Sequence, residues 1–247
     1  DSGVDSTVSG PPLNSTYVTV SFSVAGPELY FVKTAAAGAG TCTLGNECTL
    51  ATALTNIGSR TNVRIFVNDA STYSNTVTLT ANSWLTSQGV TGTTFDSLFS
   101  ISTPAQGTLA TRPSLGQSRP TLSGAAATVT MNNSSQVRGV IINVSAGSNK
   151  GLVATNATGT LLVTDTDVTS AGGNAIDLSN TSVDFTGGGL AIVSTSGNGF
   201  EATSGGTVTV QGTGNTISTG SGIALNVSST TIGASGLTFQ SISANGG

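Results

Sequence analysis

The sequence predicts an all-β protein, a parallel β-helix in which each coil takes about 24 residues. The main observation is a repeat in the C-terminal half, where apolar residues at the heads of Ser/Thr/Gly-rich turns recur 24, 24, 25 and 25 residues apart. These residues are Val144, Val168, Ile192, Ile217 and Ile242. A fixed period of this length indicates stacked units, because each unit buries its apolar side only against its neighbours.

A second apolar column follows the turns and supports the same repeat. Its members are Leu152, Ile176, Phe200 and Ile223, each with a partner two residues on, at Ala154, Leu178, Ala202 and Leu225. Short runs such as 17–22 and 207–210 alternate between apolar and small polar residues, which predicts strands. Further strands are expected at 29–32, 63–67, 76–80, 84–85, 95–101, 128–131 and 137–144.

One helix is expected, within residues 48–57. Apolar residues at 50, 53, 54 and 57 follow the spacing of one helix face, and Gly58 then ends the helix. We therefore divide the chain into an N-terminal arm with one strand (1–28), a helix-bearing cap (29–60) and the β-helix (61–247).

The repeat is disturbed at 103–123, where we expect an irregular loop projecting from a coil. This stretch holds Pro104, Pro113 and Pro120, and proline is excluded from interior strands. At the end of the chain, residues 242–247 open another turn with no polar capping repeat. Solenoids need such caps for solubility, so we expect the chain to be a fragment of a longer protein.

The two cysteines, Cys42 and Cys48, enclose five residues. Since the chain has no histidine and no other cysteine, the pair cannot complete a four-ligand zinc site. Its spacing also differs from that of a CxxC redox centre. We expect a small disulfide staple formed in an oxidising compartment; a reduced pair is the alternative.

Composition limits the classes of partner and of chemistry. Only 7% of the residues are charged and the formal net charge is −4, which argues against nucleic acid, because that partner needs a basic surface. No apolar stretch reaches the ~20 residues that cross a membrane, so we expect no membrane insertion of this segment. No charged-then-apolar leader opens the chain, and we expect an exported protein whose signal peptide is removed. The lack of histidine excludes a Ser-His-Asp triad.

The order of motifs in residues 29–80 resembles the N-terminal cap of large bacterial surface proteins with right-handed parallel β-helices, the autotransporter-type or polymorphic-outer-membrane-protein-like passengers. The matching pieces are a strand at 30–34, a Gly-rich loop at 38–40, the C-T-L-A-T-A-L helix at 48–54, the V-R-I-F strand at 63–66 and the T-V-T-L strand at 76–79. This resemblance implies a right-handed β-helix and a secreted protein, or one displayed on the outer-membrane surface of a bacterium. It implies no particular reaction.

Three asparagines in equivalent turns predict a ladder. Asn149, Asn174 and Asn198 are 25 and 24 residues apart, and stacked coils place equivalent positions ~4.8 Å from each other. We therefore expect their side-chain amides to bond from coil to coil, a structural role.

Asp177 and Glu201 are the main candidates for chemistry. Both stand between inward apolar residues, so they should face outward on neighbouring coils, with Lys150 as the only nearby base. Carboxylates ~5 Å apart match a retaining glycosidase, or half of a calcium site. The default interpretation is a solvated pair, and Asp165 and Asp167 are interpreted in the same way.

The function expected from these features is that of a rigid binding or stalk module of an adhesin. Its partners would be a host or bacterial surface protein or a glycan, and no cofactor or metal is expected. The loop at 103–123 is the expected binding element, through Arg112 and Arg119, because irregular excursions from repeat scaffolds often carry function. The alternative is a polysaccharide lyase or glycoside hydrolase that uses Asp177, Glu201 and Asp184.

Overall fold

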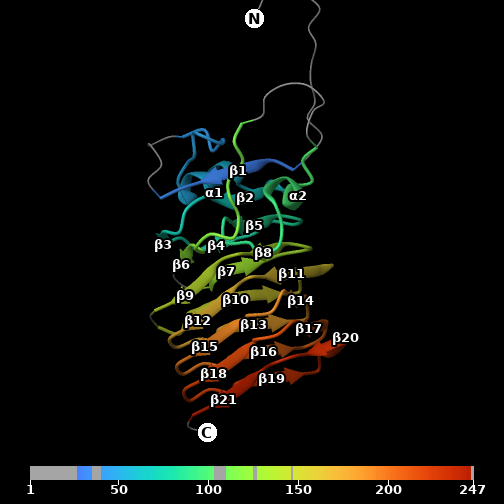
Figure 1. Ribbon diagram of the computed structural model, residues 1–247. Helices are drawn as coiled ribbons and strands as arrows, with labels where there is room; N and C mark the ends of the chain where they lie inside the picture. The colour runs from blue at the N-terminus through green and yellow to red at the C-terminus, as the bar shows by residue number, and fades with distance from the viewer. Residues whose placement is uncertain (1–26, 35–39, 103–109, 125–126, 146, 246–247) are drawn as a thin grey trace, which may run out of the picture.

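The computed structural model describes residues 27–34, 40–102, 110–124, 127–145 and 147–245. It shows a parallel β-solenoid in which three sheets wrap one core (Figure 1). This confirms the predicted all-β coil architecture. The predicted arm at 1–28 lies outside the described residues except for its last two positions.

The three sheets are built from strands of successive coils. Sheet A runs in the order β1 (Leu29–Val32), β2 (Arg64–Val67), β5 (Trp84–Ser87), β8 (Gln136–Arg138), β11 (Thr160–Thr164), β14 (Ser182–Thr186), β17 (Thr207–Val210) and β20 (Thr231–Leu237). Sheet B contains β4 (Val77–Thr78), β7 (Ala127–Met131), β10 (Lys150–Thr155), β13 (Ile176–Ser179), β16 (Phe200–Thr203) and β19 (Leu225–Ser228). Sheet C contains β3 (Thr72–Tyr73), β6 (Thr121–Leu122), β9 (Ile141–Val144), β12 (Asp167–Ser170), β15 (Ala191–Ser194), β18 (Thr216–Thr219) and β21 (Ser241–Ala244). From β7 to β21 the chain makes five complete coils, each adding one strand to each sheet.

The register differs from the predicted one at two places. Val168, Ile192, Ile217 and Ile242 do form one column. However, Ile142 lies opposite Val168, and the predicted member Val144 lies opposite Ser170. In the second column Leu225 follows Phe200, while the predicted Ile223 is 56% exposed. Coil length varies through the turns, so counting from turn to turn shifts the register.

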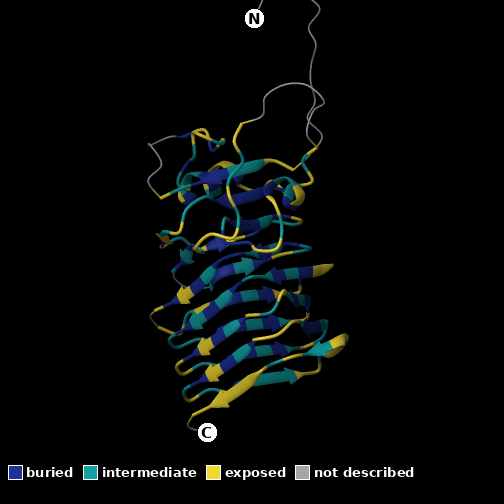
Figure 2. Cartoon of the chain, viewed as in Figure 1, coloured by how far each residue is buried: buried dark blue, intermediate teal, exposed yellow. Residues whose placement is uncertain are grey.

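The inner side chains form a continuous apolar core, and Figure 2 shows buried and less buried residues alternating along the strands. Buried hydroxyl groups close the ends of three sheet C strands. Ser170, Ser194 and Thr219 lie in register and donate to the carbonyl oxygens of Asn149, Gly173 and Gly222, at 2.9, 3.2 and 2.8 Å respectively. The corners therefore keep their polar groups paired inside an apolar stack.

The expected helix is confirmed as α1 (Leu50–Ile57), which closes the N-terminal end of the core (Figure 1). Thr49 caps its start by accepting a hydrogen bond from Thr52 N at 3.2 Å, and Gly58 ends it with φ 55°. Leu50, Ala53 and Ile57 are buried in the same cluster as the strands. Among the described residues, no helix has the length and apolar character needed to cross a membrane.

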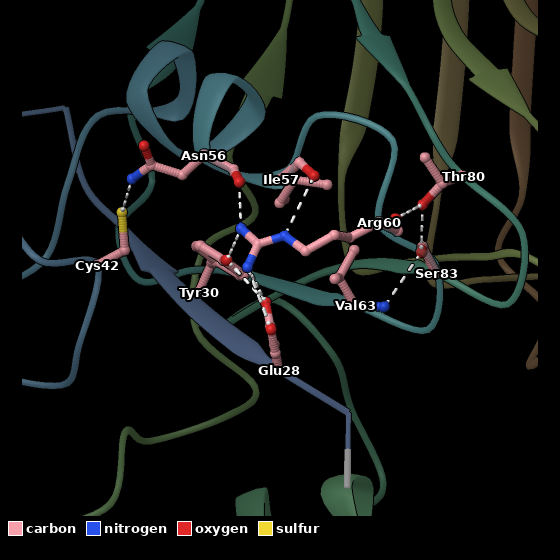
Figure 3. Close-up of polar contacts among 9 residues, drawn as sticks. All are labelled: Glu28, Tyr30, Cys42, Asn56, Ile57, Arg60, Val63, Thr80 and Ser83. Carbon is pink, nitrogen blue, oxygen red and sulfur yellow. Dashed lines mark hydrogen bonds and ion pairs between the residues drawn. The ribbon is translucent and has the colours of Figure 1, made fainter.

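A hydrogen-bonded network joins the end of α1 to β1 (Figure 3). Arg60 Nη1 forms an ion pair with Glu28 Oε2 at 2.8 Å, and Tyr30 donates its hydroxyl hydrogen to the same oxygen at 2.8 Å. Arg60 also bonds to Asn56 O and, through Nε, to Ile57 O at 3.3 Å. The last helical carbonyl groups thus have a cationic partner, and a positive charge at this end interacts favourably with the negative end of the helix dipole.

The strand predicted at 95–101 is wrong, because residues 95–99 form a second helix, α2 (Phe95–Phe99). Thr94 Oγ1 accepts from Ser97 N at 3.2 Å and starts the helix. Phe95 and Phe99 then pack on rings of the outer face of sheet A; the Phe95 ring lies 5.1 Å from that of Phe66. Tertiary packing therefore overrides the local preference of an aromatic-rich run for a strand.

The irregular segment predicted at 103–123 ends earlier than expected. Residues 103–109 lie outside the described part, residues 110–120 contain no strand, and β6 begins at Thr121. The segment also follows the solenoid: Gly116 N donates to Val90 O at 2.8 Å and Gln117 N to Gln88 O at 3.0 Å. Its described part is therefore docked along a coil, where a projecting loop was expected.

Candidate functional site

Asp177 and Glu201 lie directly opposite each other on β13 and β16, on the outer face of sheet B. The alternation of inward Ile176 and Leu178 turns Asp177 outward, and inward Phe200 and Ala202 do the same for Glu201. The two carboxylates are thus neighbours although 24 positions separate them in the sequence.

Both carboxylates are tied into one polar network. Lys150 Nζ forms an ion pair with Asp177 Oδ2, and Asn174 Nδ2 donates to the same oxygen at 3.2 Å and also to Glu201 Oε2. Asn198 Nδ2 donates to Glu201 Oε2 at 3.1 Å. Donors within the chain therefore occupy Oδ2 of Asp177 and Oε2 of Glu201.

A further asparagine, on the next coil, also contacts Glu201: Asn226 Nδ2 donates to Glu201 Oε1 at 3.2 Å.

Asp184, the third carboxylate of the enzyme hypothesis, lies on a different sheet. It lies on β14 of sheet A and accepts a hydrogen bond from Thr209 Oγ1 at 2.7 Å. The three predicted carboxylates therefore do not share one face.

The predicted asparagine ladder is shorter than expected and is bonded differently. Asn198 N donates to Asn174 Oδ1 at 3.0 Å, and Ile223 N donates to Asn198 Oδ1 at 3.0 Å, so side chains bond to backbone. Asn149 is out of line, because Leu152 pairs with Ile176 and this register puts Lys150 beside Asn174. The coil from Ile142 to Val168 has a longer turn, which displaces Asn149 by one position.

A second asparagine pair, which the sequence reasoning missed, lies at the corner between sheets B and A. Asn180 Nδ2 donates to Asn156 Oδ1 at 2.8 Å. Both residues have positive φ, 49° and 53°, as do Ser204 and Ser229 at the same corner of the next coils. The 24-residue spacing of Asn156 and Asn180 was the available signal, since asparagine tolerates this backbone conformation.

The two arginines predicted to bind a partner are both ion-paired within the chain. Arg112 Nε lies 2.6 Å from Asp96 Oδ1 beside α2, at a groove of about 340 Å³. Arg119 pairs with Asp167 Oδ2 and donates through Nη1 to Asp165 O at 3.1 Å. The Asp165/Asp167 stretch, expected to be solvated, therefore anchors the 110–120 segment.

The disulfide is confirmed: Cys42 and Cys48 are bonded, with their Cα atoms 4.5 Å apart. Both are buried next to β1 and α1, and Val32 forms a bridge with Cys48. The staple therefore fixes the loop that covers the N-terminal end of the core.

Another cluster missed by sequence reasoning lies on the outer face of sheet A. Arg64 on β2 and Trp84 on β5 are opposite each other, and the guanidinium carbon of Arg64 lies 3.9 Å from the indole centroid. Arg138 on β8 approaches the same ring from the next strand, at 5.0 Å. We call these three residues the Arg–Trp–Arg cluster.

Hydrogen bonds hold the Arg–Trp–Arg cluster in place. Arg64 Nη1 donates to Asn82 O at 2.7 Å, and Arg64 Nη2 donates to Asn62 Oδ1 at 3.2 Å. Arg138 Nε donates to Gln136 Oε1 at 2.9 Å. Burial, and then the like charge of Arg138, lower the pKa of Arg64 to about 10. Burial also lowers the pKa of Arg138, against the opposing field of Asp165.

Sequence spacing gave no signal for this cluster, because its residues come from coils of very different length. Trp84 pairs with Arg64 on one neighbouring strand and with Gln136 on the other.

In the described part of the chain no group of three or more acidic, histidine or cysteine side chains is arranged to hold a metal ion. The chain matches no known family model, no curated protein and no solved structure.

Proposed function

We propose that this chain is a rigid binding or stalk module of a secreted or surface-displayed bacterial adhesin, which contacts a cell surface or a glycan. The observation that carries the proposal is the stack of three parallel sheets (Figure 1), in a chain rich in small and polar residues. Backbone hydrogen bonds between neighbouring strands join each coil of the stack to the next, and stacked repeats create extended binding surfaces. The buried Cys42–Cys48 bond supports an oxidising location outside the cytoplasm.

The proposal is tested by binding to intact cells. The folded chain is labelled and titrated onto bacterial and mammalian cells, with heat-unfolded chain as the control. Saturable binding by the folded chain alone is the expected result. Binding no greater than that of the unfolded chain would contradict the proposal.

The second candidate function is polysaccharide cleavage, which is favoured by one observation: Asp177 and Glu201 stand opposite each other with Lys150 beside them. Release of new reducing ends from acidic and neutral polysaccharides measures this activity. The Asp177→Asn, Glu201→Gln double variant keeps the shape of both side chains and removes their charge. Cleavage that the double variant lacks would replace the adhesin proposal with an enzyme.

A further inference from the structure

The basic residues of the chain fall into two groups. The chain has seven Lys and Arg residues, and all of them lie in the described part. Those with an ion-pair partner there are Lys33, Arg60, Arg112, Arg119 and Lys150. Arg64 and Arg138 have no such partner within the described residues, and both stand against Trp84. The unpaired positive charge of that part of the chain is thus concentrated at one aromatic ring.

Two positive charges beside one ring, neither of them in an ion pair, favour the binding of an anion. A guanidinium gains about 0.5–2 kcal/mol from an aromatic face, but the two cations also repel each other. The lowered pKa of Arg64 has this repulsion as one of its causes, after burial. Asp165 acts on Arg138 through its field without forming an ion pair, so an oxyanion bound at the surface would add the direct counter-charge that the cluster lacks.

The donors that such an anion would meet belong to Arg138. Its Nε donates to Gln136, and within the described part its two terminal nitrogens take part in no hydrogen bond or ion pair. Arg138 is only partly buried, whereas Arg64 is 9% exposed and bonds to the carbonyl oxygens of Val63 and Asn82. The two terminal nitrogens of Arg138 can therefore donate to two oxygens of a carboxylate or sulfate. Arg64 adds a fixed positive charge on the strand at the other side of Trp84.

The surroundings favour a saccharide over a peptide. β5 and β8 are hydrogen-bonded to neighbouring strands on both sides, so they offer no free edge to which a peptide could add as a strand. The outward neighbours along sheet A include Gln136, Thr164 and Thr186, whose amide and hydroxyl groups suit sugar hydroxyls. We propose that Arg138, backed by Trp84 and Arg64, binds the carboxylate or sulfate groups of an acidic polysaccharide. This inference rests on the proposed function and names the chemistry of its ligand.

Trp84 is the only tryptophan of the chain, so its fluorescence reports on this site directly. The chain is titrated with polygalacturonate, with dextran sulfate, with neutral dextran and, as an acidic peptide, with polyglutamate. We expect one or both acidic polysaccharides to change the Trp84 emission and neutral dextran to leave it unchanged. Polygalacturonate and dextran sulfate separate recognition of carboxylates from recognition of sulfates.

The matched variants are Arg138→Gln and Lys33→Gln, which change the net charge equally. Loss of a charged hydrogen bond predicts an affinity about tenfold lower or more for Arg138→Gln. Lys33→Gln, which breaks a partly exposed ion pair with Glu47, should stay within about twofold of the parent chain. Arg138→Lys keeps the charge but lacks the planar fork, so an intermediate loss is expected. Thermal unfolding of each variant verifies that the fold is kept.

Three results would overturn the inference. They are equal losses in Arg138→Gln and Lys33→Gln, no response to either acidic polysaccharide, and an Arg138-dependent response to polyglutamate alone. If folded Arg138→Gln binds cells as the parent chain does, this site is wrong but the adhesin proposal stands. If the parent chain binds acidic polysaccharide but no cells, the adhesin proposal fails while the site remains.

Discussion

Asn180 donates its side-chain amide to Asn156 Oδ1 at 2.8 Å, one coil earlier, and both residues have a left-handed backbone. The pair joins two coils at the corner between sheets B and A. Ser204 and Ser229 continue the same backbone conformation through the following coils. One corner of the solenoid is therefore fixed by residues that accept positive φ, and its amide bond adds a direct link along the axis.

Substitution at Asn180 separates these two contributions. Asn180→Ala removes the amide and strains the backbone at φ 49°, so we expect unfolding to become easier by about 2 kcal/mol. Asn180→Gly removes the amide but tolerates the backbone, so its loss should be about 1 kcal/mol. Urea unfolding followed by circular dichroism measures both. Equal losses would show that backbone strain contributes nothing.

The glycine column at the turns after sheet C predicts a strong steric effect. A Cβ on Gly197 would lie 2.2 Å from the carbonyl group of Gly173, one coil earlier. We expect Gly197→Ala to lower the free energy of unfolding by about 3 kcal/mol, because the backbone must shift. Gly189→Ala is the control: its Cβ would meet nothing within 4 Å, but its φ of 69° still costs about 1 kcal/mol. A Gly197 variant as stable as the control would contradict the close stacking.

Asp69 gives the N-terminal coil a pH-dependent contribution to stability. Burial alone would raise the pKa of Asp69, but hydrogen bonds from Tyr73 at 2.6 Å, Thr34 N at 2.9 Å and Ser71 outweigh it and lower the pKa. A lowered pKa in the folded state means that the carboxylate stabilises the fold above its unfolded pKa of about 4. That stabilisation is lost as the pH falls through the folded value.

Asp69→Asn should therefore lower stability at neutral pH by about 1 kcal/mol and approach the parent chain under acid conditions. Urea unfolding followed by Trp84 fluorescence at several pH values measures the difference. Tyr73→Phe removes one donor and should show a smaller change of the same sign. A difference that stays constant from neutral to acid pH would refute the linkage.

The Cys42–Cys48 bond closes a short loop, so its removal should have a moderate effect. The chain-entropy estimate for a loop of this size is about 2 kcal/mol. We expect reduction of the parent chain and the Cys42→Ala, Cys48→Ala double variant to destabilise the cap region by similar amounts. Hydrogen exchange of α1 and β1 amides measures this effect locally, with sheet B amides as the internal control. A loss spread evenly over all coils would contradict a local role.

The predictable part of the fold follows from local patterns. Alternating apolar residues predicted the strands, the spacing of Leu50, Ala53 and Ile57 predicted α1, and the close Cys42 and Cys48 predicted the disulfide. Each of these features depends on neighbours within a few residues, or on a period that the chain repeats. Local patterns therefore carry enough information to define the coil.

The tertiary structure decided which residues meet across coils. Strands pair through backbone groups that are the same at every position, so turn length and core packing choose the register. For this reason Asn149 falls out of the ladder, α2 replaces an expected strand, and Arg64 and Arg138 meet at Trp84. Asp177 and Glu201 were placed correctly as neighbours, because the coils between them are regular. Where a coil carries a long excursion, no sequence spacing encodes the contact, and only the folded stack brings its residues together.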